Sequence, residues 1–194
     1  MLTVEMPAGA QVDALLRSRR SARVFGPGTP PEEMIREALE DAVHVPNHRR
    51  TEPWRFVVAR GEALGRLADR AGALKIRPGG GDEGRTAAER TRQELRTAAY
   101  ALAVVQKEAP DPEIREEDYA SCILAALQVG LALWARGVAL RWSSGGVTRD
   151  PEVRTLLGLR QEERLAILCY LGYAASMPAH AAPRPAAERT VWLA

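Results

Sequence analysis

The stretch "EDYASCILAALQVGLALWAR", residues 117–136, decides the fold of this chain. Apolar side chains lie on nearly every side of a helix built from it, so it predicts a long helix that is buried on several sides. Gly137 follows directly and is placed to cap the C-terminus of this helix. The continuous apolar part, residues 123–135, is too short to span a bilayer and contains Gln128. We therefore expect the core helix of a soluble, cytoplasmic protein with no membrane partner.

The segments on either side alternate between strand and helix patterns. β-branched and aromatic runs predict strands, and apolar residues at helical spacing predict helices. The predicted strands are 54–60, 99–107, 138–144 and 164–173, and the other predicted helices include 11–18, 63–74, 85–98 and 150–158. The highly charged helix 85–98 is expected to be a solvated flap. Strands separated by helices indicate an α/β or α+β domain, and the length suits one domain over residues 1–194.

A further helix is predicted after the turn "GPGTPPEEM", residues 26–34. Thr29 and Glu32 have the spacing of a capping box, and Pro30 suits the first helical position. Apolar residues then recur at helical spacing until Pro46 ends the helix.

Composition limits the classes of function. Lys and Arg number 27 against 25 Asp and Glu, a formal charge of only +2, whereas a general nucleic-acid binder usually carries a larger excess. Cys122 and Cys169 lie in apolar stretches and are expected to be buried thiols of a reducing compartment. The first ten residues lack the basic start and apolar run of a secretory signal. The sequence therefore predicts an intracellular protein with no nucleic-acid partner.

Positive charge is nevertheless concentrated in "RSRRSARVF", residues 17–25. A phosphate monoester needs fork-shaped donors and a small hydroxyl in close register, and Arg19, Arg20 and Ser21 supply both. The alternative is a set of exposed arginines at a helix C-terminus, where the helix dipole favours them. The local pattern leaves these two interpretations about equal.

Two other polar segments stand next to predicted strands. The loop "HVPNHRRTEPWRF", residues 44–56, offers His44 and His48 as donors, although Pro46 between them argues against a metal-binding helix. The segment "RWSSGG", residues 141–146, places Trp142, Ser143 and Ser144 at a strand end before a glycine turn, a common position for ligands.

The sequence offers no self-contained catalytic site. Neither cysteine has the context of a nucleophile or metal ligand, and Ser143 and Ser144 lack a nucleophile elbow. The glycine-rich loop at 77–84 lacks Walker-type spacing. A protein with a concave site and no nucleophile–base pair is expected to take its chemistry from a cofactor.

The three polar segments, in this order and spacing, resemble the nitroreductase family of FMN flavoproteins. "RRSARVF" resembles its Arg-Arg-Ser-x-Arg signature, "VPNHRRTEPWRFVV" its proline loop before a Pro-Trp pair and strand, and "GVALRWSSGGVTRDPEVRTLLGL" its later segment near the flavin ring. The likeness covers about residues 11–173 and is greatest to the short, single-domain bacterial branch of minimal nitroreductases.

The resemblance implies a three-layer α+β fold with a mostly antiparallel sheet and an intertwined homodimer whose tail, residues 176–194, wraps the partner. It implies FMN held at the dimer interface, with NADH or NADPH as electron donor. In relatives the matching residues bind the FMN phosphate and ribityl chain (Arg19, Arg20, Ser21), contact FMN from the partner subunit (His44, His48) and lie near the ring (Trp142, Ser143, Ser144).

The implied activity is a ping-pong NAD(P)H oxidoreductase that reduces nitroaromatic, quinone or similar electron-poor small molecules. The alternatives are other flavin chemistry on the same fold, namely dehydrogenation, dehalogenation or flavin fragmentation, and a non-catalytic flavin-binding dimer. Two departures bear on the site. Glu52 replaces a frequent Gln before the Pro-Trp pair, and Ser143 stands where the short branch often has an arginine, while Arg141 precedes Trp142. Arg17 and Arg23 are expected to be surface charges.

Overall fold

The computed structural model describes residues 8–76, 79, 81–177 and 182–193. The N-terminal residues 1–7, part of the predicted loop 77–84 and part of the predicted tail 176–194 lie outside the described residues. The elements, in chain order, are α1 Gly9–Ser18, α2 Glu32–Ala42, the 3-10 turn η1 His48–Arg50, β1 Trp54–Ala59, α3 Gly61–Ala73, α4 Gly81–Arg96, β2 Tyr100–Lys107, α5 Pro112–Ala135, β3 Ala139–Ser143, α6 Gly146–Arg149, α7 Pro151–Leu156, β4 Glu163–Gly172 and the 3-10 turn η2 Ala186–Arg189.

The four strands form one antiparallel sheet in the order β1-β2-β4-β3. The central pair is fully covered: every residue of β2 except Lys107 is buried, which explains its continuous apolar run. Two isolated bridges extend the sheet, since Ser21 pairs in parallel with Leu140, and Phe25 pairs with Ala174. The first bridge places Ser21 at the free edge of β3, and the second places Phe25 beside the residues that follow β4.

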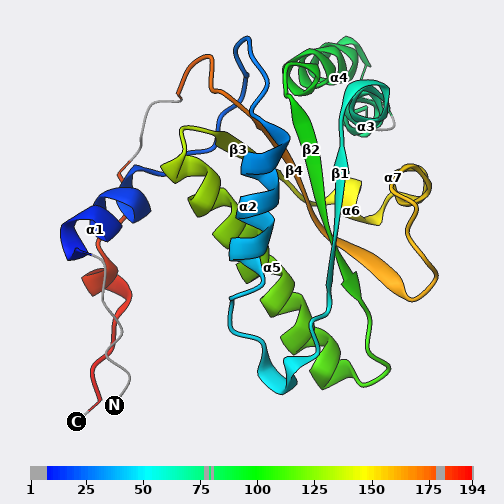
Figure 1. Ribbon diagram of the computed structural model, residues 1–194. Helices are drawn as coiled ribbons and strands as arrows, with labels where there is room; N and C mark the ends of the chain where they lie inside the picture. Colours follow the sequence, from blue (N-terminus) through cyan, green and yellow to red (C-terminus); the bar gives the residue numbers. More distant parts are fainter. Residues whose placement is uncertain (1–7, 77–78, 80, 178–181, 194) are drawn as a thin grey trace.

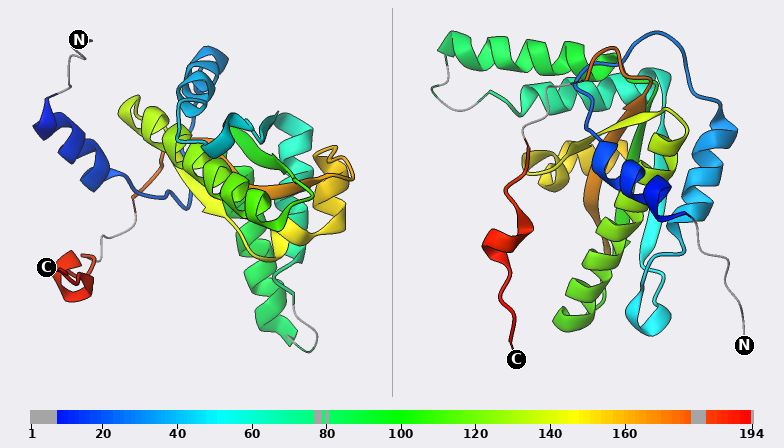
Figure 2. Two further views of the ribbon diagram at one scale, coloured as in Figure 1. Left: turned by 90° about the horizontal axis from the view of Figure 1, so that it is seen from below. Right: turned by 90° about the vertical axis from the view of Figure 1, so that its left-hand side faces the viewer.

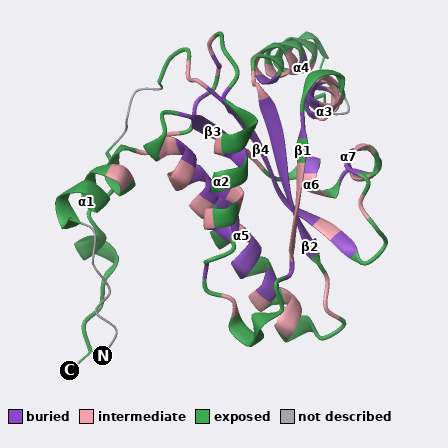
Figure 3. Ribbon diagram, in the orientation of Figure 1, coloured by how far each residue is buried: buried purple, intermediate pink, exposed green. Residues whose placement is uncertain are grey.

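Helices cover both faces of the sheet (Figure 1). Alternate residues of a strand point to opposite faces. Tyr100, Leu102 and Val104 of β2 therefore pack in the core under α2 and α5, while Ala101 and Ala103 pack under α3, α6 and α7. The result is the predicted three-layer α+β arrangement, with the buried residues concentrated between the layers (Figure 3).

The central helix α5 is buried along one stripe rather than on several sides. Ala125, Ala126 and Val129 are inaccessible against the sheet and α2, whereas Leu124 and Leu127 on the other side are 39% and 38% exposed. α5 is long and apolar enough to cross a membrane, but in this structure it packs as a core helix. The apolar positions that the sequence carries on its outer side are thus left uncovered within one chain.

The starts of α2 and α5 differ from the sequence-based prediction. No side chain caps α2, whose N-cap residue is Pro31, so the predicted capping box of Thr29 and Glu32 is absent. The helix α5 begins at Pro112 rather than at residue 117, because the Asp111 carboxylate accepts hydrogen bonds from the first turn. The predicted cap by Gly137 is present, with φ at 78° and its amide donating to the Trp134 carbonyl.

The charged helix α4 packs more firmly than a solvated flap. Its Ala88 and Leu95 are 2% exposed, and a side chain at Gly72 of α3 would meet the Ala88 carbonyl at 2.8 Å. Glycine at this position therefore permits the close approach of the two helices. The ion pair between Arg96 and Asp69, at 2.6 Å, joins them at the surface.

The first helix α1 and the last turn η2 stand apart from this body (Figure 2). Figure 2 shows α1 and η2 off the sheet, on the side where α5 is open. The Trp134 indole donates to the Ser18 hydroxyl at 2.9 Å and ties the end of α1 to the end of α5. Beyond η2, Val191, Trp192 and Leu193 are 82%, 90% and 93% exposed. No element in the described part of the chain packs over these three apolar side chains.

Candidate functional site

Two adjoining hollows lie between α4, the end of α3 and the end of β3. They have volumes of about 630 and about 270 Å³, and Lys75, Thr91 and Arg141 line both. The larger hollow is further lined by Arg23, Arg90 and Glu94, among others. The smaller one is lined by Trp142, Ser143, Ser144 and an apolar wall that includes Ala71, Leu95 and Val147. We call the two together the β3–α4 pocket.

The arginine segment is fixed to this pocket by backbone contacts. The ring of Phe25 lies against Gly172, where an added Cβ would meet it at 3.0 Å, and the Phe25 amide donates to the Thr97 hydroxyl at 3.0 Å. The Gly26 amide donates to the Tyr173 carbonyl at 2.7 Å. Together with the bridge from Ser21 to Leu140, these contacts hold residues 21–26 against the start of β3 and the residues that follow β4.

The four arginines of this segment have different surroundings. Arg17 is 81% exposed and pairs with Asp13 at 3.6 Å, as a surface charge does. Arg20 folds back and donates to the carbonyls of Arg17 and Arg19 at 2.6 and 2.8 Å. The half-buried Arg19 side chain makes no hydrogen bond or ion pair with any described residue. Arg23, expected to be a surface charge, lines the pocket instead.

Glu94 is the centre of the polar contacts in the pocket. Its carboxylate receives Arg90 Nε at 3.0 Å and Arg141 Nη1 at 3.0 Å, and Arg23 lies at 3.4 Å. The Glu94 side chain is only 11% exposed. Burial raises the pKa of this carboxyl, but the hydrogen bonds from Arg90 and Arg141 outweigh burial and hold the pKa below its ordinary value.

The end of β3 divides between the two faces of the sheet. Arg141 is the cross-strand partner of Tyr170 and reaches the pocket, where it also donates to the Arg23 carbonyl at 3.0 Å. Trp142 packs into the core on the α5 side, as the alternation of strand residues requires. Ser143 and Ser144 follow at the pocket wall, before Gly145 turns the chain with φ at 79°.

A buried hydroxyl lies behind the pocket. Tyr170 is inaccessible, and among the described residues its hydroxyl is the buried side-chain polar atom without a hydrogen-bond partner. Burial raises its pKa, and the nearby Arg141 opposes the increase. Tyr170 packs in the same cluster as Ala71, Leu95 and Val147, which form the apolar wall of the pocket.

The histidine loop lies elsewhere in the single chain. His44 lies in the turn after α2 and His48 in η1, and both are exposed. The loop that carries them lies opposite the end of the molecule where α4 lies (Figure 1). The structure therefore brings Ser21 and Arg23 to the β3 region, whereas Arg19 and Arg20 line neither hollow. It does not bring the two histidines to the pocket within one chain.

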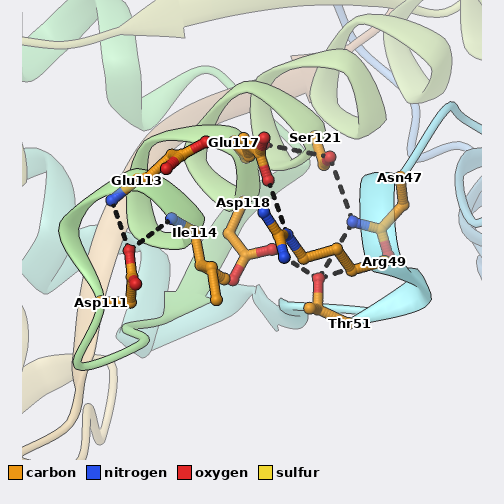
Figure 4. Close-up of polar contacts among 9 residues, drawn as sticks. All are labelled: Asn47, Arg49, Thr51, Asp111, Glu113, Ile114, Glu117, Asp118 and Ser121. Carbon is orange, nitrogen blue, oxygen red and sulfur yellow. Dashed lines mark hydrogen bonds and ion pairs between the residues drawn. The ribbon is translucent and has the colours of Figure 1, made fainter.

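Side chains hold this loop against α5 (Figure 4). Asn47 donates to the Ser121 hydroxyl at 3.2 Å and accepts the Glu52 amide at 2.8 Å, while Thr51 donates to the buried Asp118. The backbone is strained: Arg49, Arg50 and Glu52 have φ values of 65°, 52° and 45°. Non-glycine residues adopt such values only where neighbouring contacts compel them. These hydrogen bonds hold the loop in one defined conformation against α5.

Sequence reasoning missed several side chains of the β3–α4 pocket, namely Arg23, Lys75, Arg90, Thr91 and Glu94. The five come from three segments, and no local motif links them. The Arg-Arg-Ser-x-Arg signature carries a weak signal, because its last arginine is Arg23, on the same segment as Arg19 and Ser21.

Comparison with known proteins adds independent findings. The sequence matches the model of the nitroreductase family over residues 16–173. It is 32% identical over 167 residues to a Bacillus subtilis protein named "Putative NAD(P)H nitroreductase YfhC", and the match covers 84% of each chain.

Solved structures with the same architecture carry related names. A nitroreductase-like family protein from Bacillus cereus superposes with a TM-score of 0.81 at 25% identity, covering 100% of this chain and 99% of that one. The FMN-dependent nitroreductase NfnB from Mycobacterium smegmatis, solved in complex with NADPH, gives a TM-score of 0.74 at 21% identity and covers 95% and 99%.

Proposed function

This chain belongs to the nitroreductase family, and from that premise we propose that it is an FMN-dependent oxidoreductase that takes electrons from NADH or NADPH. The proposed acceptors are electron-poor small molecules such as nitroaromatics or quinones, reduced in a ping-pong sequence. The observation that carries the proposal is the β3–α4 pocket, which joins the edge of the arginine segment to the serines at the end of β3.

The residues of the pocket suit FMN in size and chemistry. Ligand sites usually measure about 300–1,000 Å³ and combine apolar walls with a few polar groups. The larger hollow alone reaches about 630 Å³, and the Ala71, Leu95 and Val147 wall can face a flat ring.

Each segment has a proposed role in holding the cofactor. Arg19 and Ser21, with Arg20, bind the phosphate and the sugar chain, since guanidinium groups and a hydroxyl match a phosphate monoester. Ser143 and Ser144 face the ring at the end of β3. When bound, FMN supplies the chemistry by accepting a hydride equivalent from the nicotinamide and passing it to the acceptor. The protein then orients both rings and excludes water, and no protein acid or base is required.

We further propose a homodimer with two such sites. The uncovered apolar side of α5, with Leu124 and Leu127, offers a surface for a second copy, and the exposed end around Trp192 offers a segment to wrap it. In this arrangement His44 and His48, which stand far from the pocket of their own chain, contact the FMN of the partner. In this proposal residues 1–194 of each copy form a single domain.

A visible spectrum with and without added FMN tests the proposal. We expect flavin absorption in the purified protein or after reconstitution, and bleaching of the flavin band on anaerobic addition of NADH or NADPH. Absence of FMN binding would refute the proposal. Tight FMN binding with no bleaching by either nicotinamide would favour the non-catalytic flavin-binding dimer. Bleaching without reduction of nitroaromatics or quinones would favour different flavin chemistry.

A further inference from the structure

The carboxylate of Glu94 is an unusual feature of a pocket that otherwise gathers positive charge. Arg23, Lys75, Arg90 and Arg141 all line this space. The other two carboxylates there, Asp82 and Glu83, are exposed at the outer end of α4, whereas the Glu94 side chain is 11% exposed. Glu94 is therefore the one inner carboxylate among the described residues of the pocket.

Both carboxylate oxygens of Glu94 accept hydrogen bonds from arginine side chains. Oε1 receives Arg90 and faces Arg23, while Oε2 receives Arg141. Arg141 is held at a second point, because the same Nη1 donates to the Arg23 carbonyl at 3.0 Å. Removal of this carboxylate would leave three guanidinium groups facing one another without a counter-charge.

We propose that Glu94 is a positioning residue that sets the electrostatic potential of the β3–α4 pocket, fixing Arg141 and cancelling part of the positive charge that a bound flavin would experience. This inference rests on the proposed function. Two-electron reduction adds negative charge to a flavin ring, and nearby cations favour that charge while nearby anions oppose it. Glu94 therefore lowers the reduction potential of the bound FMN relative to a pocket with the arginines alone.

Charge-changing variants on one helix separate this role from a merely structural one. Glu94→Gln keeps the shape and removes the negative charge, so the pocket should bind reduced FMN more tightly relative to oxidised FMN, by about tenfold. For a two-electron couple a tenfold change corresponds to about 30 mV upward. Arg90→Gln removes one positive charge from the same cluster and should shift the potential downward. If the two substitutions only loosened the pocket, the reduction potential would not be expected to shift in opposite directions in the two variants.

Glu89→Gln is the matched control. It makes the same change of charge on α4, but Glu89 is half exposed, contacts Arg92 and Gln93, and does not line the pocket. The measurement is an anaerobic redox titration of the FMN-loaded proteins against a reference dye, with circular dichroism as a check of folding.

The outcomes are distinguishable from failure of the proposed function. Failure of the wild-type protein to bind FMN would overturn the proposed function and this inference with it. Wild-type FMN binding combined with a Glu94→Gln potential no different from that of Glu89→Gln would overturn the inference alone. Shifts of Glu94→Gln and Arg90→Gln in the same direction would also overturn it. If Glu94→Gln does not fold, the sign of the Arg90→Gln shift decides, and only a downward shift supports the inference.

Discussion

Substitution of Arg19 by alanine is the sharpest test of the phosphate site. The Arg19 side chain is half buried beside the segment that bridges to β3, and it makes no hydrogen bond or ion pair with any described residue. A hydrogen bond to a charged group contributes about 1.5–3 kcal/mol. Since about 1.4 kcal/mol is a factor of ten in affinity, we expect Arg19→Ala to weaken FMN binding about 10- to 150-fold.

Arg17→Ala is the matched control for that variant. Arg17 is two residues away, and its only ion pair in the described structure is an exposed one to Asp13 at 3.6 Å. Such pairs contribute about 0.3–0.5 kcal/mol to a helix and nothing to a distant ligand, so FMN affinity should change less than twofold. Arg20 makes a poorer test because its guanidinium already caps α1, and its loss would disturb the helix end as well.

The assay is a titration of FMN fluorescence quenching at low ionic strength, with circular dichroism to establish that each variant folds. Arg19→Lys should recover part of the affinity, since lysine keeps the charge but not the planar fork. Equal losses in Arg17→Ala and Arg19→Ala would refute the assignment and return the segment to a diffuse basic patch.

Three further predictions concern stability, thiols and assembly. Arg55 holds the pKa of Glu163 at about 2, against an ordinary value of 4.5. One pKa unit corresponds to about 1.36 kcal/mol, and solvent around the partly exposed Arg55 weakens the ion pair. Glu163→Gln should therefore lower the free energy of unfolding at pH 7 by about 2 kcal/mol. The wild-type contribution is complete above about pH 4.5 and is lost as the pH falls toward 2, so urea midpoints should be less pH-dependent in the variant over this window, and parallel curves would contradict the prediction. Burial raises the pKa of Cys122 to about 12 and that of Cys169 as well, so Ellman's reagent should label neither thiol until denaturant is added; fast labelling of the native protein would contradict this. Leu127→Glu should convert the proposed dimer to a folded monomer, because it would bury a carboxylate in an apolar interface. Light scattering measures the change in mass. A dimer that persists in the variant would exclude this face of α5 as the dimer interface.

The strands were the most predictable part of the fold. All four fall within one residue of their predicted limits, because their runs of aromatic and β-branched residues carry a strong local pattern. This holds for the half-buried edge strands β1 and β3 as well as for the buried central strands. The start of α5 is not evident from the sequence because residues 112–116 are mostly polar, so no apolar periodicity marks them. The Asp111-Pro112 pair was the available signal, since aspartate caps helices and proline favours the first turn.

The candidate site was only partly predictable from the sequence. The segments around Ser21 and Ser144 were found because each carries a local pattern next to a strand. The grouping of Arg23 and Arg141 around Glu94 depends on contacts between residues that lie 47 and 71 positions apart. No periodicity or spacing encodes such contacts, which arise only when α4 packs beside β3.

The bridge between Ser21 and Leu140 fixes the distance along β3 between Ser21 and the serines at the end of the strand. Ser21 pairs with Leu140 near the start of β3, and Ser143 stands three residues further along the strand. At about 3.3 Å per residue, the two levels are about 10 Å apart. A rigid strand, rather than flexible side chains, thus separates the proposed anchor for a ligand's anionic end from the proposed seat of its ring. A compound with the same two end groups joined by a shorter or longer chain would be rejected, because it could engage one end only at the expense of the other.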